Sequence, residues 1–160
     1  MNLSEEGRAL LKSLECAGGQ PNLVPYKDSG GVWTWGFGHA CGPHESIPKS
    51  ITPEQAESIL AYDVSCATHD ANGLIQFGSV PQNVFDALVL FIYNVGIFAL
   101  RKPPHRTMDA IQARNWLLAA NRIRAWCHDK DPKTGKMVEV QGLKNRRERE
   151  IRLLLIGQYT

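Results

Sequence analysis

The chain has 160 residues, of which 43% are hydrophobic and 21% are charged. A chain of this length forms one ordinary domain with its own core, and this composition excludes a disordered protein. The longest apolar stretch, residues 87–100, is interrupted by Asn94 and Gly96. We therefore expect no membrane-spanning segment and no stable membrane anchor.

The net charge is only +2, but it is unevenly distributed. Residues 1–80 contain four basic and nine acidic residues, whereas residues 81–160 contain fourteen basic and seven acidic residues. A basic half favours a polyanionic partner, either nucleic acid or a polymer of the bacterial envelope. Trp116 and Trp126 have the spacing of a helical core and do not interleave with the arginines, which favours the envelope polymer over nucleic acid.

The first predicted element is a helix that follows Ser4, a good N-cap, with Glu5 and Glu6 in its first turn. It ends before Gly18, which places Glu15 in its last turn. The negative end of a helix disfavours an ionised carboxylate, and this suits a general acid. Acidic residues near the front also argue against a signal peptide, so we expect the protein to start in the cytoplasm.

The next predicted element is a β-hairpin formed by residues 23–26 and 32–35, because turn residues at 28–31 separate two runs of β-formers. Thr52, Pro53 and Gln55 then form a capping box that predicts a helix to about residue 67. A strongly apolar helix is expected over residues 82–100, at the centre of the domain.

Two further helices are expected to be capped by Thr107 and Asn115, followed by a polar loop at 129–139 and a last helix from about Gly142. These elements predict an α+β fold in a single domain. A small β lobe spans about residues 16–52, and the helical lobe spans about residues 53–160 together with the N-terminal helix.

Three residues are the candidate catalytic groups: Glu15 at the helix end, and Asp28 and Thr34 six residues apart in the hairpin. Two carboxylates and a hydroxyl are suited to cleaving a glycosidic bond, with one acid protonating the leaving oxygen. The alternative for Glu15, taken alone, is a solvated acid at a helix end, and the alternative for Thr34 is a strand former.

The residues around this triad resemble the phage T4-type lysozymes, the muramidase endolysins of glycoside hydrolase family 24. The resemblance rests on Glu15 and the stretch YKDSGGVWTWGFGH at 26–39. It continues in ITPEQAE at 51–57, NVG at 94–96, GL at 142–143, NRR at 145–147 and Glu150. It covers nearly the whole chain.

The resemblance implies a lysozyme-like fold with a cleft between the lobes, and hydrolysis of the β-1,4 bond between N-acetylmuramic acid and N-acetylglucosamine in peptidoglycan. It implies that Glu15 is the general acid and that Asp28 and Thr34 hold a water on the other face of the sugar, which predicts inversion. No cofactor or metal is implied.

The same resemblance implies contacts around this triad. Asn94 and Tyr26 are expected to line the cleft, and Arg146 to lie beside Glu15, although Arg147 is its direct neighbour. His39 is expected to pair with Asp63 for structure rather than chemistry.

Two departures from the family pattern concern the loop after the acid. The chain from Glu15 to Asp28 is longer than usual by several residues, and Cys16 stands where the family usually has Gly. The four cysteines are scattered and form no CxxC pair, which predicts reduced thiols and no zinc site. A disulfide between Cys16 and Cys41 across the cleft is a secondary hypothesis.

A lysozyme without an export signal implies release through a holin, accumulation in the host cytoplasm and then action on the wall in the periplasm. A monomer is expected. Three alternatives stay open: a lytic transglycosylase that acts on the same bond, a chitin-cleaving hydrolase, and a non-catalytic wall-binding homologue.

Overall fold

The structure, a computed structural model, describes residues 1–28, 30–75, 78–101, 106–131 and 133–160. Its α-helices are α1 (Glu5–Glu15), α2 (Pro53–Leu74), α3 (Gln82–Val95), α4 (Thr107–Gln112), α5 (Trp116–Arg124) and α6 (Gln141–Ile156). Two 3-10 helices, η1 (Ala17–Gly19) and η2 (Ile97–Arg101), follow α1 and α3. The strands are β1 (Asn22–Lys27), β2 (Trp33–Gly36), β3 (His39–Ala40), β4 (His128–Lys130) and β5 (Met137–Glu139).

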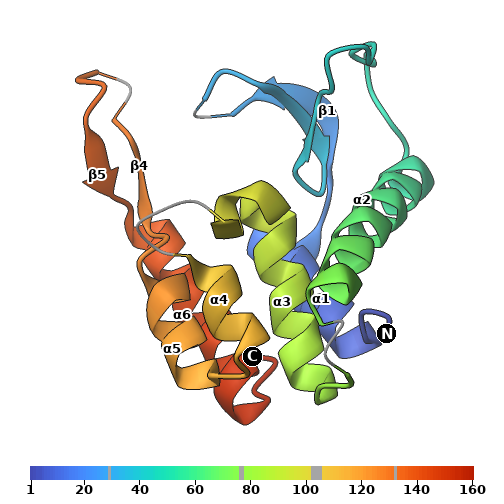
Figure 1. Cartoon of the computed structure of the whole chain (residues 1–160). Coiled ribbons are helices and arrows are strands. Elements are labelled where there is room, and N and C mark those ends of the chain that lie inside the picture. The colour runs from blue at the N-terminus through green and yellow to red at the C-terminus, as the bar shows by residue number, and fades with distance from the viewer. Residues whose placement is uncertain (29, 76–77, 102–105, 132) are drawn as a thin grey trace.

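The strands form two antiparallel sheets, β1-β2-β3 and β4-β5. In Figure 1 they stand on opposite sides at the same end of the molecule, above the helices. The α+β fold with a small N-terminal β lobe is confirmed. None of the helices in the described part of the chain is long and apolar enough to cross a membrane.

Helix α1 places Glu15 where the sequence predicted it. The Ser4 side chain accepts a hydrogen bond from the backbone N–H of Gly7 (3.0 Å) and so caps the first turn. Glu15 is the last helical residue, and Cys16 is already extended. The buried face of α1, which includes Leu10 and Leu11, packs against α3 and fixes the direction of the helix end.

Helices α2 and α3 form the centre of the helical lobe, and both differ in length from expectation. The predicted capping box at Thr52 is confirmed, but α2 continues to Leu74 because Ala71 and Leu74 extend its buried stripe. Helix α3 is almost wholly buried from Val84 to Ile92. It ends at Val95 rather than near residue 100, because Gly96 takes a left-handed φ of 74° and the chain continues as η2.

The C-terminal part corrects two predictions. Thr107 does not cap a helix: it is the first residue of α4, and its side chain is completely buried. The expected polar loop at 129–139 is largely the β4–β5 hairpin, whose turn is closed by Asp131 accepting hydrogen bonds from the backbone N–H groups of Lys133 and Thr134 (both 2.8 Å). The predicted cap at Asn115 is confirmed.

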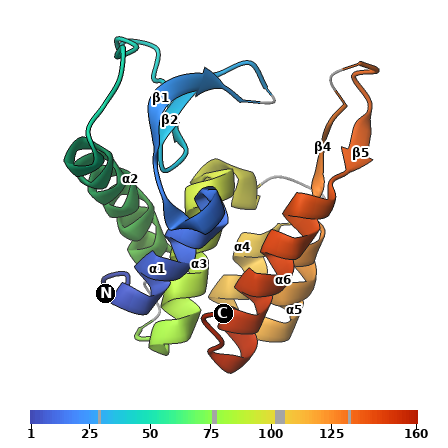
Figure 2. The ribbon, with the colours of Figure 1, turned by 180° about the vertical axis from the view of Figure 1, so that it is seen from behind.

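Helix α6 closes the core from the C-terminal side and starts at Gln141, one residue before the expected position. It packs on both α3 and α5, and Figure 2 shows it in red in front of α5 and beside α3. Its buried polar residues, Arg146, Arg147 and Glu150, therefore face the interior of the helical lobe rather than solvent.

Candidate active site

Glu15 is held by an ion pair with α6. Its Oε1 lies 2.7 Å from Nη2 of Arg146, and the side chains of Glu15 and Arg146 are only 12% and 8% exposed. This pair is confirmed in the predicted register, with Arg146 rather than Arg147 at the acid. Burial disfavours the charge of Arg146, but Glu15 and Glu150 outweigh burial and raise its pKa. A permanent cation therefore fixes the direction of the Glu15 carboxyl.

Gly38 gives the carboxyl of Glu15 its space. A Cβ atom at position 38 would lie 2.9 Å from Oε2 of Glu15, closer than real Cβ contacts allow. The backbone of Gly38 also has a φ of 81°, which side chains with a Cβ rarely adopt. Both observations explain why glycine stands between β2 and β3.

Asp28 closes the turn between β1 and β2. Its Oδ1 accepts hydrogen bonds from the backbone N–H groups of Gly30 (2.9 Å) and Val32 (2.8 Å), and the side chain is exposed. In the described part of the chain, Oδ2 accepts no hydrogen bond. The carboxylate is thus oriented by the backbone through one oxygen, while the other is available to a water.

Thr34 lies on β2, opposite Tyr26 of β1, and is 4% exposed. Its Oγ1 donates to the carbonyl of Val32 (3.2 Å), which leaves the lone pairs of the hydroxyl to accept a hydrogen bond. Tyr26 is 40% exposed, and burial together with Cys16, Asp28 and Glu15 raises its pKa. The negative charges of both predicted acids, Asp28 and Glu15, therefore contribute to the raised pKa of Tyr26.

The ion pair of Glu15 continues into a buried network on α6. Glu150 is completely buried and lies between two arginines: its Oε1 is 3.0 Å from Nε of Arg146, and its Oε2 is 3.2 Å from Nε of Arg147. Arg147 is also completely buried and donates from Nη2 to Oδ1 of Asn94, at the end of α3. The structure thus connects two predicted site residues, Glu15 and Asn94, through three charges.

Sequence reasoning missed this network and Tyr93. Arg146 and Arg147 stand four and three residues before Glu150, a spacing that brings side chains together on a helix, but their burial is set by α3. The Tyr93 hydroxyl donates to the carbonyl of Phe37 (2.9 Å), and burial together with Glu15 raises its pKa. Tyr93 also lines a cavity of about 290 Å³ with Gly38 and Gly96, and Gly38 is the residue that leaves room for the Glu15 carboxyl.

Comparisons with known proteins show the family to which this chain belongs. The family model described as phage lysozyme matches residues 19–150. The chain belongs to the phage lysozyme family. It is similar to the endolysin of Bacillus phage B103, with 34% identity over 99% of the chain and 56% of that relative. A second such relative, from Bacillus phage PZA, is also covered over 56% of its length, so the chain spans about half of these relatives.

Solved structures support the same family. The endolysin from Escherichia coli O157:H7 phage FAHEc1 has a TM-score of 0.84 and 33% identity, covering 100% of this chain and 97% of that one. The muramidase domain of SpmX from Asticaccaulis excentricus has a TM-score of 0.77 and 26% identity, covering 96% and 97% of the two chains. The resemblance stated from the sequence is therefore confirmed.

His39 makes the ion pair with Asp63 that the resemblance to the phage lysozymes implied. Its Nδ1 lies 2.8 Å from Oδ2 of Asp63 on α2, as predicted, and its Nε2 lies 2.9 Å from Oε2 of Glu45, which sequence reasoning missed. Burial disfavours the charged ring, but the hydrogen bonds with Glu45 and Asp63 outweigh burial and raise its pKa. The His39 ring therefore joins β3 to α2 between two carboxylates.

Cysteines do not bridge the site in this member of the phage lysozyme family. All four are free thiols, so the hypothesised disulfide between Cys16 and Cys41 is not formed. Cys16 is buried with its sulfur 3.6 Å from the carbonyl oxygen of Gly36. The extra residues after it form η1, whose Gly18 has a left-handed φ of 70°, and return the chain to β1. Among the described residues, no group of three or more His, Cys, Asp and Glu side chains is arranged to hold a metal ion.

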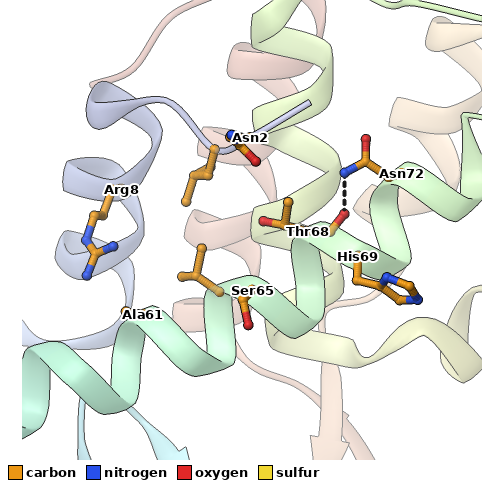
Figure 3. Close-up of a pocket in the computed structure, with 9 residues that line it drawn as sticks. Asn2, Arg8, Ala61, Ser65, Thr68, His69 and Asn72 are labelled. Carbon is orange, nitrogen blue, oxygen red and sulfur yellow. Dashed lines mark hydrogen bonds between the residues drawn. The ribbon is translucent and has the colours of Figure 1, made fainter.

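A second cavity, of about 390 Å³, lies between the N-terminal segment, α1 and α2 (Figure 3). It is lined by Arg8, Ser65, Thr68 and other residues, none of which belongs to the predicted site. Arg8 lies 3.4 Å from the carboxylate of Glu57, so this guanidinium already has an anionic partner. This cavity therefore supplies no group to the chemistry of Glu15 and Asp28.

Proposed function

We propose that this protein is an endolysin that hydrolyses the β-1,4 bond between N-acetylmuramic acid and N-acetylglucosamine in peptidoglycan and so lyses the host cell. The observation that carries the proposal is the nearly buried Glu15 carboxyl, fixed by Arg146 and given room by Gly38, in a chain that belongs to the phage lysozyme family. The family membership adds the expected substrate class to this geometry.

In the proposed reaction, Glu15 gives its proton to the glycosidic oxygen as the bond to the anomeric carbon breaks. Asp28 and Thr34 hold a water on the opposite face of the sugar. Asp28 accepts a proton from that water as its oxygen bonds to the anomeric carbon, which inverts the configuration. Oδ2 of Asp28, which accepts no hydrogen bond from the described residues, supports its role as a base. The acceptor lone pairs of the Thr34 hydroxyl support its role as a water anchor.

The decisive experiment replaces the acid without changing its shape. Glu15→Gln keeps an oxygen for Arg146 but cannot donate the proton, so lysis of chloroform-treated Gram-negative cells should fall by about 10²–10⁴-fold while folding persists. Glu6→Gln is the matched control, because Glu6 is an exposed acid in the first turn of the same helix. Undiminished lysis by Glu15→Gln would refute the assignment.

Product analysis separates hydrolysis from the alternatives on the same bond. Hydrolysis releases a reducing muramic acid end, whereas a lytic transglycosylase releases a 1,6-anhydro end. A panel of purified polymers separates peptidoglycan from chitin, and a homologue that only binds the wall would release no fragments. Proton NMR of the first products gives the anomeric configuration, and a retained configuration would contradict the inverting mechanism.

Three properties of the whole protein stay predictions: release through a holin, accumulation in the cytoplasm before lysis, and the monomeric state. Release through a holin and cytoplasmic accumulation before lysis are tested by fractionating cells that express the protein with and without a holin. The monomeric state is tested by light scattering in solution.

A further inference from the structure

The side chain of Asn94 has a fixed orientation because its partner has only one kind of hydrogen-bonding group. Arg147 donates from Nη2 to Asn94, and a guanidinium carries donors and no acceptor. The atom of the Asn94 amide that faces Arg147 must therefore be the carbonyl oxygen Oδ1. The opposite arrangement would place two donors against each other.

Arg147 is itself held from three directions. Its Nε lies 3.2 Å from Oε2 of Glu150, and its guanidinium carbon lies 5.0 Å from the centre of the Phe91 ring. Its side chain is completely buried between α3 and α6. Separate atoms serve the two polar partners, since Nε faces Glu150 and Nη2 faces Asn94. Because the guanidinium is planar and rigid, this fork of N–H groups holds Nη2 in one fixed position relative to Asn94.

Glu150 links this fork to the catalytic acid. Each of its carboxylate oxygens faces one arginine, and the first of these, Arg146, contacts Glu15 through Nη2. The position of the Glu15 carboxyl and the orientation of the Asn94 amide therefore depend on the same buried carboxylate.

We propose that Arg147, held by Glu150, is a positioning residue that fixes the Asn94 amide as a hydrogen-bond donor toward an oxygen acceptor of the glycan. Arg147 occupies the buried side of Asn94, whereas Asn94 itself is exposed at the end of α3. Among the described residues, Nδ2 of Asn94 donates no hydrogen bond, so its two hydrogens are available to a ligand. Asn94 selects an acceptor, such as an acetamido carbonyl or a carboxylate, and rejects a donor at this point.

The inference deepens the proposed function and rests on it for the identity of the ligand. Its test measures binding rather than cleavage, so the two ideas fail separately. The background is Asp28→Asn, because asparagine keeps the oxygen that accepts from Gly30 and Val32 and leaves the buried network of α6 unchanged. The probe is a purified tetrasaccharide of alternating N-acetylglucosamine and N-acetylmuramic acid, titrated by calorimetry.

Asn94→Asp is the informative substitution. Aspartate keeps an oxygen for Arg147 but has no donor for the glycan, so the Kd should rise by about three- to tenfold, the effect of one hydrogen bond. Asn121→Asp is the matched control, because Asn121 is also exposed and its Oδ1 accepts from an arginine, Nη1 of Arg124 at 3.1 Å, outside the site. Its Kd should stay unchanged. An unchanged Kd for Asn94→Asp would mean that Asn94 only holds Arg147 and would overturn the proposal.

The role of Arg147 is tested by a double substitution. Arg147→Lys keeps a cation beside Glu150 but loses the fork that reaches Asn94, so the Kd should rise as in Asn94→Asp. If Arg147 acts through Asn94, the double variant should bind no more weakly than Asn94→Asp alone. Effects that multiply would overturn the positioning role. Thermal unfolding reports whether Arg147→Lys folds, and if it does not, the Asn94→Asp and Asn121→Asp pair still decides whether Asn94 donates to the glycan.

Discussion

At the scale of single residues, Gly38 shows how one missing side chain shapes the site. We expect Gly38→Ala to lower kcat on purified peptidoglycan by about 10²-fold, because its Cβ would come within 2.9 Å of Oε2 of Glu15 and displace the carboxyl. The left-handed φ of 81° adds a strain of about 1–2 kcal/mol to the folded state. Steady-state kinetics and thermal unfolding measure the two effects.

Gly157→Ala separates these effects. Gly157 follows α6 with a φ of 69°, and a Cβ there meets Asn83 only at an ordinary contact distance of 3.7 Å. This control should lose similar stability but keep its kcat. Equal losses of kcat in both variants would show that backbone strain, rather than the approach to Glu15, limits activity.

Single residues of the site could be predicted from the sequence, but the buried contacts that connect them could not. The ion pair of Glu15 with Arg146 was predicted because the family resemblance spans both residues, and Asn94 was placed in the site for the same reason. The links between them, Arg147 and Glu150, are charged residues on a polar helix and look solvated in a sequence. Only the packing of α6 against α3 determines that both are completely buried.

At the scale of elements, helix starts were more predictable than helix ends. Ser4 and Thr52 cap α1 and α2 through local hydrogen bonds that a sequence displays directly. The end of α2 depends on how far the partner surface continues, and the polar β4–β5 hairpin was mistaken for a loop because its strands have no buried face. Both depend on tertiary contacts or turn chemistry rather than on hydrophobic pattern.

The contact of β3 with α2 makes stability depend on pH through His39. Its pKa is raised in the folded protein by Glu45 and Asp63, so the protonated ring stabilises the fold fully below its unfolded pKa of about 6.5. This stabilisation is lost as the pH rises through the raised folded pKa. Glu45 is 40% exposed and its bond is screened by solvent, so the charged hydrogen bond with Asp63 supplies most of this stabilisation, about 1.5 kcal/mol.

Thermal unfolding between about pH 5 and pH 9 measures this loss. His39→Gln should remove most of the pH dependence in this window, because glutamine keeps a polar side chain but does not titrate. Trp35 also packs on the His39 ring, with the two ring centres 5.1 Å apart. Because tryptophan does not titrate, this contact adds no pH dependence of its own. A variant with the same pH dependence as the unmodified protein would show that another group is responsible.

At the scale of the whole molecule, we expect the uneven charge to let the C-terminal half help hold the protein on an anionic wall. This half carries twice as many basic as acidic residues, and Lys130, Lys133 and Lys136 stand on or beside the exposed β4–β5 hairpin. No ion pair involves these three lysines in the part of the chain that the structure describes. The hairpin stands at the same end of the molecule as the β1–β3 sheet (Figure 1).

We expect salt to weaken binding of the Asp28→Asn variant to purified anionic cell walls. Raising the ionic strength from about 0.1 M to about 1 M shortens the Debye length from about 10 Å to about 3 Å, which screens exposed charges that do not form close pairs. Sedimentation of walls with bound protein measures the effect, and uncharged chitin serves as the control polymer. Replacing the three lysines by glutamine should reduce the salt dependence, because fewer counterions are then exchanged on binding. Binding to the walls that is the same at both ionic strengths would exclude the electrostatic account and leave the cleft contacts as the source of affinity.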